Sequence, residues 1–347
     1  MNNKLRITFG MIVLNGEPFL HYNLRSLYRY AHQIIVVEGA CPGAASVATH
    51  DGHSIDGTLE VLKKFKEEED PDNKLIVVHA SDDGYLDNFW PEKDEMSQAY
   101  ASRATGNYLW QVDCDEFYVE EQMDRLLAIL DHELPDAVSF PSLTFWGGLK
   151  YVADSFYMIS DNAREFHRLF AWGPGYRYKS HRPPTVLDMN GKDTRSKKWL
   201  RACDLERLGI FHYHYSLLFP HQVYNKVCYY QGRDGEKIAI DSWEEVVYRR
   251  LKKPFRAHNV YQYIGWLERY NGEHPAFVEL MMNDIASGTL SVPLRECSDV
   301  EKILSKRSYR LVTIVLRFWA KILLTQPLNF LFRIYKKFIY VLRFKES

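Results

Sequence analysis

A short apolar strand that runs directly into three acids is the feature that most constrains this chain. Residues 108–112 (YLWQV) have the length and composition of a buried strand, and Asp113, Asp115 and Glu116 follow at once. Side chains two apart in a strand share a face, so Asp113 and Asp115 are expected to point the same way. Two anions packed together are costly unless a cation lies between them, and carboxylate oxygens suit Mg²⁺ or Mn²⁺. The alternative is an acidic turn that caps a helix starting near Glu120.

The chain before this strand alternates apolar strands with helical segments. Residues 7–14, 34–37 and 74–79 are apolar runs of strand length. The predicted helices are residues 19–30, a segment from near Thr58, and residues 92–104. Strands that alternate with helices in this way predict an α/β fold with buried parallel strands.

Polar residues follow the first two strands, where they end. Asn15 and Glu17 come after the first strand, and Glu38 ends the second. Open α/β sheets bind ligands at the carboxyl ends of their strands. A single acid such as Glu38 could accept hydrogen bonds from a ribose or a uracil, and the alternative is a solvated loop acid.

Four short motifs in this order resemble a known family. They are NGEPFL at residues 15–20, SIDGT at 54–58, ATG at 104–106 and DCDE at 113–116. Together they are similar to the family 2-type glycosyltransferases of the GT-A fold, over roughly residues 5–120. The resemblance implies a Rossmann-like, nucleotide-binding mixed sheet flanked by helices, a nucleotide-sugar donor, and a Mn²⁺ or Mg²⁺ ion on the Asp-x-Asp pair. It also implies inversion at the transferred sugar carbon.

The chain departs from the family pattern at two nucleotide contacts. The family commonly has two acids at the end of the second strand, where this chain has Glu38 and a longer loop. An Arg-Asn pair of the family would fall on Ser97 and Gln98. The residues predicted to contact the nucleotide sugar are Asn15, Glu17, Glu38, Asp56, Gln98, Asp113, Arg182 and Lys226.

The acceptor side is expected to begin after residue 120. Residues 164–172 and 176–185 resemble a segment found in a subset of the family, a strand followed by a loop with a His, here His181. The Glu that often follows that His is missing. Two prolines fix an extended backbone after Arg182, which suits a rigid loop that holds Arg182 towards an anion, and the alternative is a solvated basic loop. The residues considered as general base are Asp161, Glu165, His181 and Asp188, with His181 and Asp188 preferred because they flank this loop.

A late pair of histidines supplies a candidate third metal ligand. His212 and His214 lie two apart in the strand-like run 209–217 and therefore share a face. The resemblance implies that one of them binds the ion with Asp113 and Asp115; ordinary packing is the alternative for either alone. Lys226, on a predicted helix at 221–230, is placed to neutralise a leaving diphosphate.

The C-terminal segment differs in charge from the rest of the chain. From Lys306 the last 42 residues hold ten Lys or Arg against one acid, whereas the remainder carries 34 basic and 44 acidic residues. Arg310, Arg317 and Lys321 fall along one line of a helix whose other faces are apolar. Apolar runs of about six residues are far shorter than the ~20 that span a bilayer. We expect a helix that lies on an anionic membrane, with Pro327 dividing it; docking on the protein's own acidic body is the alternative.

These observations predict the organisation and the class of the protein. The predicted divisions are a glycosyltransferase domain at 1–235 (halves 1–120 and 121–235), a helical extension at 236–305 and a membrane-associating tail at 306–347. The predicted function is transfer of a sugar from a UDP-linked donor to a glycan or lipid-linked acceptor; a catalytically inactive glycan-binding or scaffold protein is the alternative. Scattered cysteines without a CxxC pair and a start without signal-peptide features predict a cytoplasmic protein on the membrane face. Signatures of P-loop, dinucleotide-binding, zincin and serine-hydrolase sites are absent from the sequence, and no nucleic-acid partner is expected.

Overall fold

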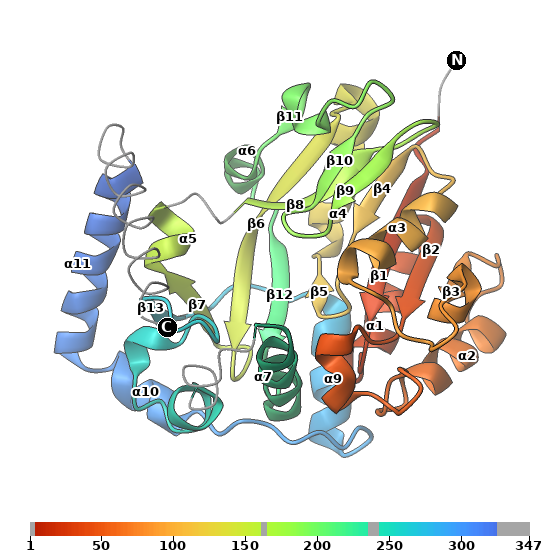
Figure 1. The fold of residues 1–347 in the computed structure, drawn as a ribbon. Coiled ribbons are helices and arrows are strands. Elements are labelled where there is room, and N and C mark those ends of the chain that lie inside the picture. Colours follow the sequence, from red (N-terminus) through yellow and green to blue (C-terminus); the bar gives the residue numbers. More distant parts are fainter. Residues whose placement is uncertain (1–3, 161–164, 235–242, 325–347) are drawn as a thin grey trace, which may run out of the picture.

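Four parallel strands form the first half of the sheet in the computed structural model, which describes residues 4–160, 165–234 and 243–324. They are β1 (Ile7–Val13), β2 (Ala31–Glu38), β3 (Leu75–Val78) and β4 (Tyr108–Gln111). They lie in the order β3-β2-β1-β4, on the right of Figure 1. The predicted parallel strands are therefore present, and their carboxyl ends meet at one edge of the sheet.

Antiparallel strands extend the sheet beyond β4. The strands β8 (Glu165–Ala171), β6 (Ala137–Trp146), β7 (Tyr151–Ser155) and β13 (Gly265–Arg269) follow in this spatial order. Three further strands join this sheet outside that order: β5 (Glu116–Phe117), β11 (Trp199–Leu200) and β12 (His212–Leu217). The strands β9 (Arg177–Ser180) and β10 (Thr185–Leu187) form a separate hairpin. Because β12 pairs with both β5 and β6, it brings the late histidines beside the acids that follow β4.

Helices pack around this sheet. Those of the first half are α1 (Phe19–Tyr28), η1 (Pro42–Val47), α2 (Thr58–Glu68), η2 (Ala80–Asp83), α3 (Lys93–Arg103) and α4 (Glu120–Glu133). Those of the second half are α5 (Phe156–Ser160), η3 (Thr194–Ser196), α6 (Ala202–Arg207), α7 (Pro220–Asp234), η4 (Trp243–Arg249), η5 (Pro254–Arg256), α9 (Ala276–Ser287), α10 (Ser298–Leu304) and α11 (Arg307–Leu324). This confirms the predicted α/β fold with a mixed sheet flanked by helices.

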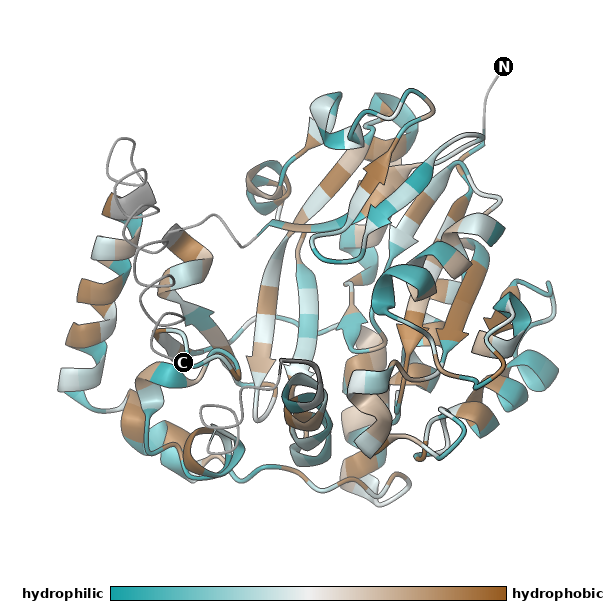
Figure 2. Cartoon of the chain, viewed as in Figure 1, coloured by the Kyte–Doolittle hydropathy of each residue, from teal (hydrophilic) through white to brown (hydrophobic). Residues whose placement is uncertain are grey.

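Separate hydrophobic cores support the two halves. One core joins β1, β2 and β4 to α1 and α4, with Phe9, Ile34 and Trp110 fully buried, and Figure 2 shows β1 and β2 as strongly hydrophobic. Another surrounds Trp146 and Trp266 beneath α10 and α11. Each fully buried side chain of this size contributes roughly 1.5–3 kcal/mol to folding.

The predicted domain divisions remain predictions, and two elements of the extension are integrated with the rest. In the described part of residues 236–305, β13 pairs with β7 and so joins the main sheet. Helix α9 packs against α1, at the other end of the chain.

Helix α11 is the described part of the predicted amphipathic tail. Tyr309, Thr313 and Ala320 are buried on the side that faces α5 and β13, and Arg317 pairs with Glu268. An apolar stripe remains exposed on the same helix, formed by Leu311, Val312, Ile314, Val315, Phe318 and Trp319. Among the described helices, none combines the length and the hydropathy needed to cross a bilayer. Pro327 and the helix predicted beyond it lie outside the described residues.

Candidate active site

A cavity of about 950 Å³ opens at the carboxyl ends of the parallel strands. Its lining comes from the loop after β1, the acids after β4, strands β8 and β12, the β9–β10 loop and α7. The predicted site residues that line it are Asn15, Glu17, Asp113, Asp115, His181, Arg182, His214 and Lys226. Residues from distant parts of the sequence therefore meet where an open α/β sheet is expected to bind its ligand.

The DCDE motif (residues 113–116) is a tight turn held by its own last residue. Glu116 donates its backbone N–H to the carbonyl of Asp113 at 3.0 Å, and its carboxylate accepts from the N–H of Asp113 at 3.1 Å. Helix α4 begins after Val119 without a side-chain cap, so the acids do not serve as a helix cap. Asp113 and Asp115 face the cavity, whereas Glu116 is fully buried behind them.

The positive charge of Arg168, on β8, offsets the negative charge of the acids in this turn. Its Nε donates to Glu116 Oε2 at 3.0 Å, its Nη2 donates to Glu116 Oε1, and Nη2 lies 3.5 Å from Asp113 Oδ2. Burial alone would raise the pKa of Asp113, but the positive charge of Arg168, helped by Arg182, holds it well below its usual range. Asp113 is therefore anionic at any physiological pH.

The two predicted histidines differ in position. His214 lines the cavity with its Nε2 3.5 Å from Asp115 Oδ1, and its ring lies with Asp113 and Glu116 in a group whose ligand atoms are all within 4.8 Å of one another. His212 is completely buried; its Nδ1 lies 2.9 Å from Ser142 Oγ and its Nε2 3.1 Å from Glu116 Oε1. Carboxylate oxygens with one imidazole nitrogen form a donor set that fits Mn²⁺, and Mg²⁺ through the oxygens.

Cations gather in the same cavity. Arg182 Nη1 donates to the hydroxyl of Tyr230 at 2.8 Å, Lys93 Nζ lies 4.2 Å from the ring centre of Tyr229, and Lys226 Nζ donates to a backbone carbonyl. No Asp or Glu of the described residues lies within 4.0 Å of any of these three cations. Burial, followed by the charge of Arg182, lowers the pKa of Lys93 to about 8. Positive charge without a carboxylate partner makes this part of the cavity suited to an anion.

The candidate general bases are only partly brought together. His181 lines the cavity; its Nδ1 lies 2.9 Å from Ser97 Oγ, and burial lowers its pKa to about 3, so the ring is neutral. Glu165 also lines the cavity, with Arg201 at 2.9 Å. Asp188 does not: it accepts from two backbone N–H groups of its own turn and lies 2.8 Å from Lys197. Asp161 lies outside the described residues.

Hydrogen bonds join the loop after β1 to the SIDGT loop. Asn15 Oδ1 accepts from the N–H of Ile55 at 2.8 Å, and the N–H of Asn15 donates to Ser54 Oγ at 3.0 Å. Asp56 Oδ2 accepts from the N–H of Glu17 at 2.9 Å, so Asp56 acts behind the cavity lining. Glu17 faces the cavity, with a buried Oε1 that has no hydrogen-bond partner among the described residues.

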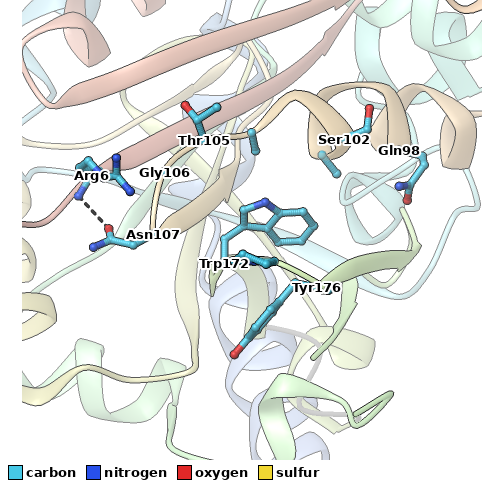
Figure 3. A pocket seen from close by; sticks show the side chains of 13 residues that line it. Arg6, Gln98, Ser102, Thr105, Gly106, Asn107, Trp172 and Tyr176 are labelled. Atoms are coloured by element: carbon cyan, nitrogen blue, oxygen red, sulfur yellow. Dashed lines mark hydrogen bonds between the residues drawn. The ribbon is translucent and has the colours of Figure 1, made fainter. Parts of the chain in front are cut away.

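Two predicted nucleotide contacts lie away from this cavity. Glu38 is completely buried and bonded to Ser54, so it is not the solvated loop acid of the alternative interpretation. Gln98 lines a different cavity of about 560 Å³, beside Trp172 and Tyr176, which Figure 3 shows. This second cavity lies near Arg6 and Gly106, at the amino ends of β1 and β4. The nucleotide role of both residues remains a prediction.

Comparisons with known proteins give partial structural similarity. No protein-family model and no curated protein matches this sequence. S. aureus TarS residues 1–349 in complex with UDP has 15% identity, with 41% of this chain and 36% of that chain covered and a TM-score of 0.30. The same protein with UDP-GlcNAc has 14% identity, 48% and 45% coverage and a TM-score of 0.33. Glucosyl-3-phosphoglycerate synthase from Mycobacterium tuberculosis with Mn²⁺, UDP and glucosyl-3-phosphoglycerate has 15% identity, 42% and 46% coverage and a TM-score of 0.28.

These similarities cover less than half of each protein. The matched part spans 36% of the length of TarS with UDP and 46% of the synthase. At TM-scores of this size they assign neither a family nor a substrate, and the site's own geometry carries the argument below.

Sequence reasoning missed two cations that line the cavity. Arg168 lies 3.5 Å from Asp113, and burial together with the charge of Arg182 lowers the pKa of Lys93. Neither residue was predicted as part of the site. The available signal was a lone Arg in the otherwise apolar second part of β8, which needs a buried anionic partner. Side chains alternate between the two faces of a strand, so the sequence could also have predicted that Glu116 points away from Asp113 and Asp115.

We predict that Glu17 makes the protein less stable as pH rises. Burial, followed by repulsion from Asp56, raises the pKa of Glu17 from 4.5 to about 7. The folded state therefore holds this proton more tightly than the unfolded state, and its stabilising effect, complete below pH 4.5, is lost as pH rises through 7. Urea unfolding should show that the free energy of unfolding falls between pH 5 and 8 in the wild type. In Glu17→Gln this fall should be smaller by about 1–3 kcal/mol.

The matched control is Glu60→Gln, at an exposed position of α2. It should keep the wild-type dependence on pH. A Glu17→Gln profile parallel to that of wild type would contradict the prediction.

Proposed function

We propose that this protein is a metal-dependent glycosyltransferase that moves a sugar from a nucleotide-sugar donor, UDP-linked, to a hydroxyl of a glycan or lipid-linked acceptor. The observation that carries the proposal is a single cavity that holds both Asp113, Asp115 and His214 and the cations Arg182 and Lys226. A diphosphate bound through a divalent ion needs carboxylates for the ion and cations for its remaining charge. The order of the four sequence motifs supports the same assignment.

The donor would be held by residues with distinct tasks. Asp113, Asp115 and His214 would hold the ion. His212, the other histidine predicted as a metal ligand, is completely buried beside Glu116. When bound, the ion would neutralise the diphosphate as the bond to the sugar carbon breaks. Arg182, Lys226 and Lys93 would meet the phosphate oxygens, and Asn15 and Glu17 would face the nucleoside from the loop after β1.

The acceptor hydroxyl must lose a proton as it attacks the sugar carbon. Of the two preferred bases, His181 and Asp188, only His181 lines the cavity, and its ring is neutral and lies beside Ser97. Nearby Arg182 and Lys93 contribute to its low pKa, so the negative charge of a bound diphosphate would raise its affinity for a proton. Direct attack from the side opposite the leaving group would give the inversion that the sequence resemblance implies.

The competing function is a catalytically inactive glycan-binding or scaffold protein of the same fold. A shared fold does not establish activity, so this alternative needs an experiment. The two proposals differ in whether UDP binds only together with a divalent ion.

We predict that UDP raises the melting temperature of wild type only when Mn²⁺ is present. A ligand at 100 times its Kd adds about 2.7 kcal/mol of stability. Asp115→Asn, which removes a charged metal ligand, should abolish this shift and lower sugar transfer at least 100-fold. Differential scanning fluorimetry with UDP, with and without Mn²⁺, and transfer assays over a panel of nucleotide sugars make the measurement.

Asp124→Asn, at an exposed position of α4, is the matched control and should behave as wild type. A melting temperature that UDP and Mn²⁺ leave unchanged would favour the inactive scaffold. Normal transfer by Asp115→Asn would remove the proposed metal site.

The same proposal places the enzyme on an anionic membrane through its C-terminal segment. Helix α11 exposes an apolar stripe, with Ile314 63%, Phe318 61% and Trp319 54% exposed, next to Arg310 and Lys321. Apolar side chains inserted at the headgroup level, together with about 1 kcal/mol for each nearby cation, would hold the protein reversibly at the surface. A lipid-linked acceptor would then be presented to the cavity while the nucleotide sugar arrives from the cytoplasm.

We predict that Ile314→Glu combined with Phe318→Glu abolishes binding to vesicles rich in phosphatidylserine. Both changes lie on the exposed stripe, so the buried contacts of Tyr309 and Ala320 are kept. Leu208→Glu, an exposed leucine at the end of α6, controls for added acidic charge and should bind as wild type. Flotation of the double variant together with the vesicles at the wild-type level would contradict a role for α11.

A further inference from the structure

A second convergence of metal-ligating side chains lies at the end of β2, outside the cavity that holds the DCDE motif. It consists of Glu38 at the end of β2, His53 in the following loop and His79 just after β3. His53 Nδ1 is 2.8 Å and His79 Nδ1 is 3.2 Å from the same carboxylate oxygen, Glu38 Oε2. The three ligand atoms all lie within 4.8 Å of one another.

Hydrogen-bond partners surround the carboxylate of Glu38, whose Oε2 meets the two histidines. Its other oxygen, Oε1, accepts from both the N–H and the hydroxyl of Ser54 at 2.8 Å each. Among the described residues no Lys or Arg lies within ion-pair distance of it. The fully buried carboxylate of Glu38 therefore has two imidazole nitrogens and no Lys or Arg beside it, a ligand set that a divalent cation can share.

We propose that Glu38, His53 and His79 bind a Zn²⁺ ion. Two imidazole nitrogens and one carboxylate oxygen form a three-ligand set that zinc uses, with the fourth position left for water. Zinc with bonds of about 2.0–2.2 Å places its ligand atoms roughly 3.3 Å apart, which the three side chains reach by small rotations. Imidazole nitrogen favours Zn²⁺ over Mg²⁺ and Mn²⁺ at this site. Zinc binding at Nδ1 of His53 and His79 requires the neutral tautomer of each ring that carries its proton on Nε2.

The ion would fix the loop that supports the nucleotide side of the large cavity. Ser54 bonds Glu38 through its N–H and hydroxyl, and its oxygen accepts from the N–H of Asn15. Two residues on, Asp56 accepts from the N–H of Glu17. A metal that joins β2, this loop and the end of β3 would therefore hold Asn15 and Glu17 in place at the cavity. The zinc site does not depend on the proposed transferase activity, because its ligands are separate from Asp113, Asp115 and His214.

The test measures zinc in protein whose other metal site is disabled. Asp115→Asn protein, stripped with chelator, loaded with Zn²⁺ and dialysed, should retain one zinc per chain by mass spectrometry. Adding His53→Ala or His79→Ala should weaken retention at least 100-fold. The matched control is His50→Ala on the same loop, whose side chain is 95% exposed, and it should retain the zinc.

A second readout uses the intact ligand set. Co²⁺ added to stripped Asp115→Asn protein should give the visible absorption of tetrahedral cobalt, and one equivalent of Zn²⁺ should displace it. Because this readout needs no histidine variant, it decides the proposal even if such a variant fails to fold. No retained zinc together with no cobalt band would overturn the proposal, as would equal retention by folded His53→Ala protein. Neither result would alter the dependence of UDP binding on Mn²⁺, so the two proposals fail separately.

Discussion

The buried pair of Arg168 and Glu116 is the interaction on which the candidate site depends. Arg168 reaches from β8 to the turn after β4, where it meets Glu116 with two nitrogens and approaches Asp113 with one of them. Removal of one partner of a buried pair typically costs about 3–5 kcal/mol, because the other charge is left uncompensated. The same pair fixes the turn, so the carboxylates of Asp113 and Asp115 are presented to the cavity as anions. This ion pair thus links β8, in the antiparallel half of the sheet, to the candidate site at the end of β4 in the parallel half.

The acidic and the basic side chains of the cavity come from different elements that meet at the carboxyl ends of the parallel strands. The acids come from the end of β4, whereas the cations come from α3, the β9–β10 loop and α7. Strand β12 brings His214 beside Asp115, and α7, which follows it, brings Lys226 and Gln222, whose amide donates to Asp115 at 2.9 Å. Because Arg182, Lys93 and Lys226 have no carboxylate partner among the described residues, the cavity can take a ligand that carries both a metal and negative charge.

The parts of this structure that depend on local sequence could be predicted. Apolar runs and helical spacing predicted the strands β1 to β4 and helices α1 to α3, because burial pattern and turn chemistry are properties of neighbouring residues. Asp113 and Asp115 could be placed at a strand end for the same reason. Partners set by tertiary packing could not be predicted: Arg168 with Glu116, and Lys93 beside Arg182, join residues far apart in the chain. Gln98 shows the limit within one helix, since Ser97 points to His181 while the next residue turns about 100° away into another cavity.

Anomalous X-ray diffraction from crystals grown with Mn²⁺ and UDP tests the central claim most directly. The account predicts a manganese peak bonded to Asp113 or Asp115 and to His214, with the UDP diphosphate between that peak and Arg182, Lys226 and Lys93. A manganese peak found only elsewhere, or UDP bound in the cavity beside Trp172 and Tyr176, would contradict it.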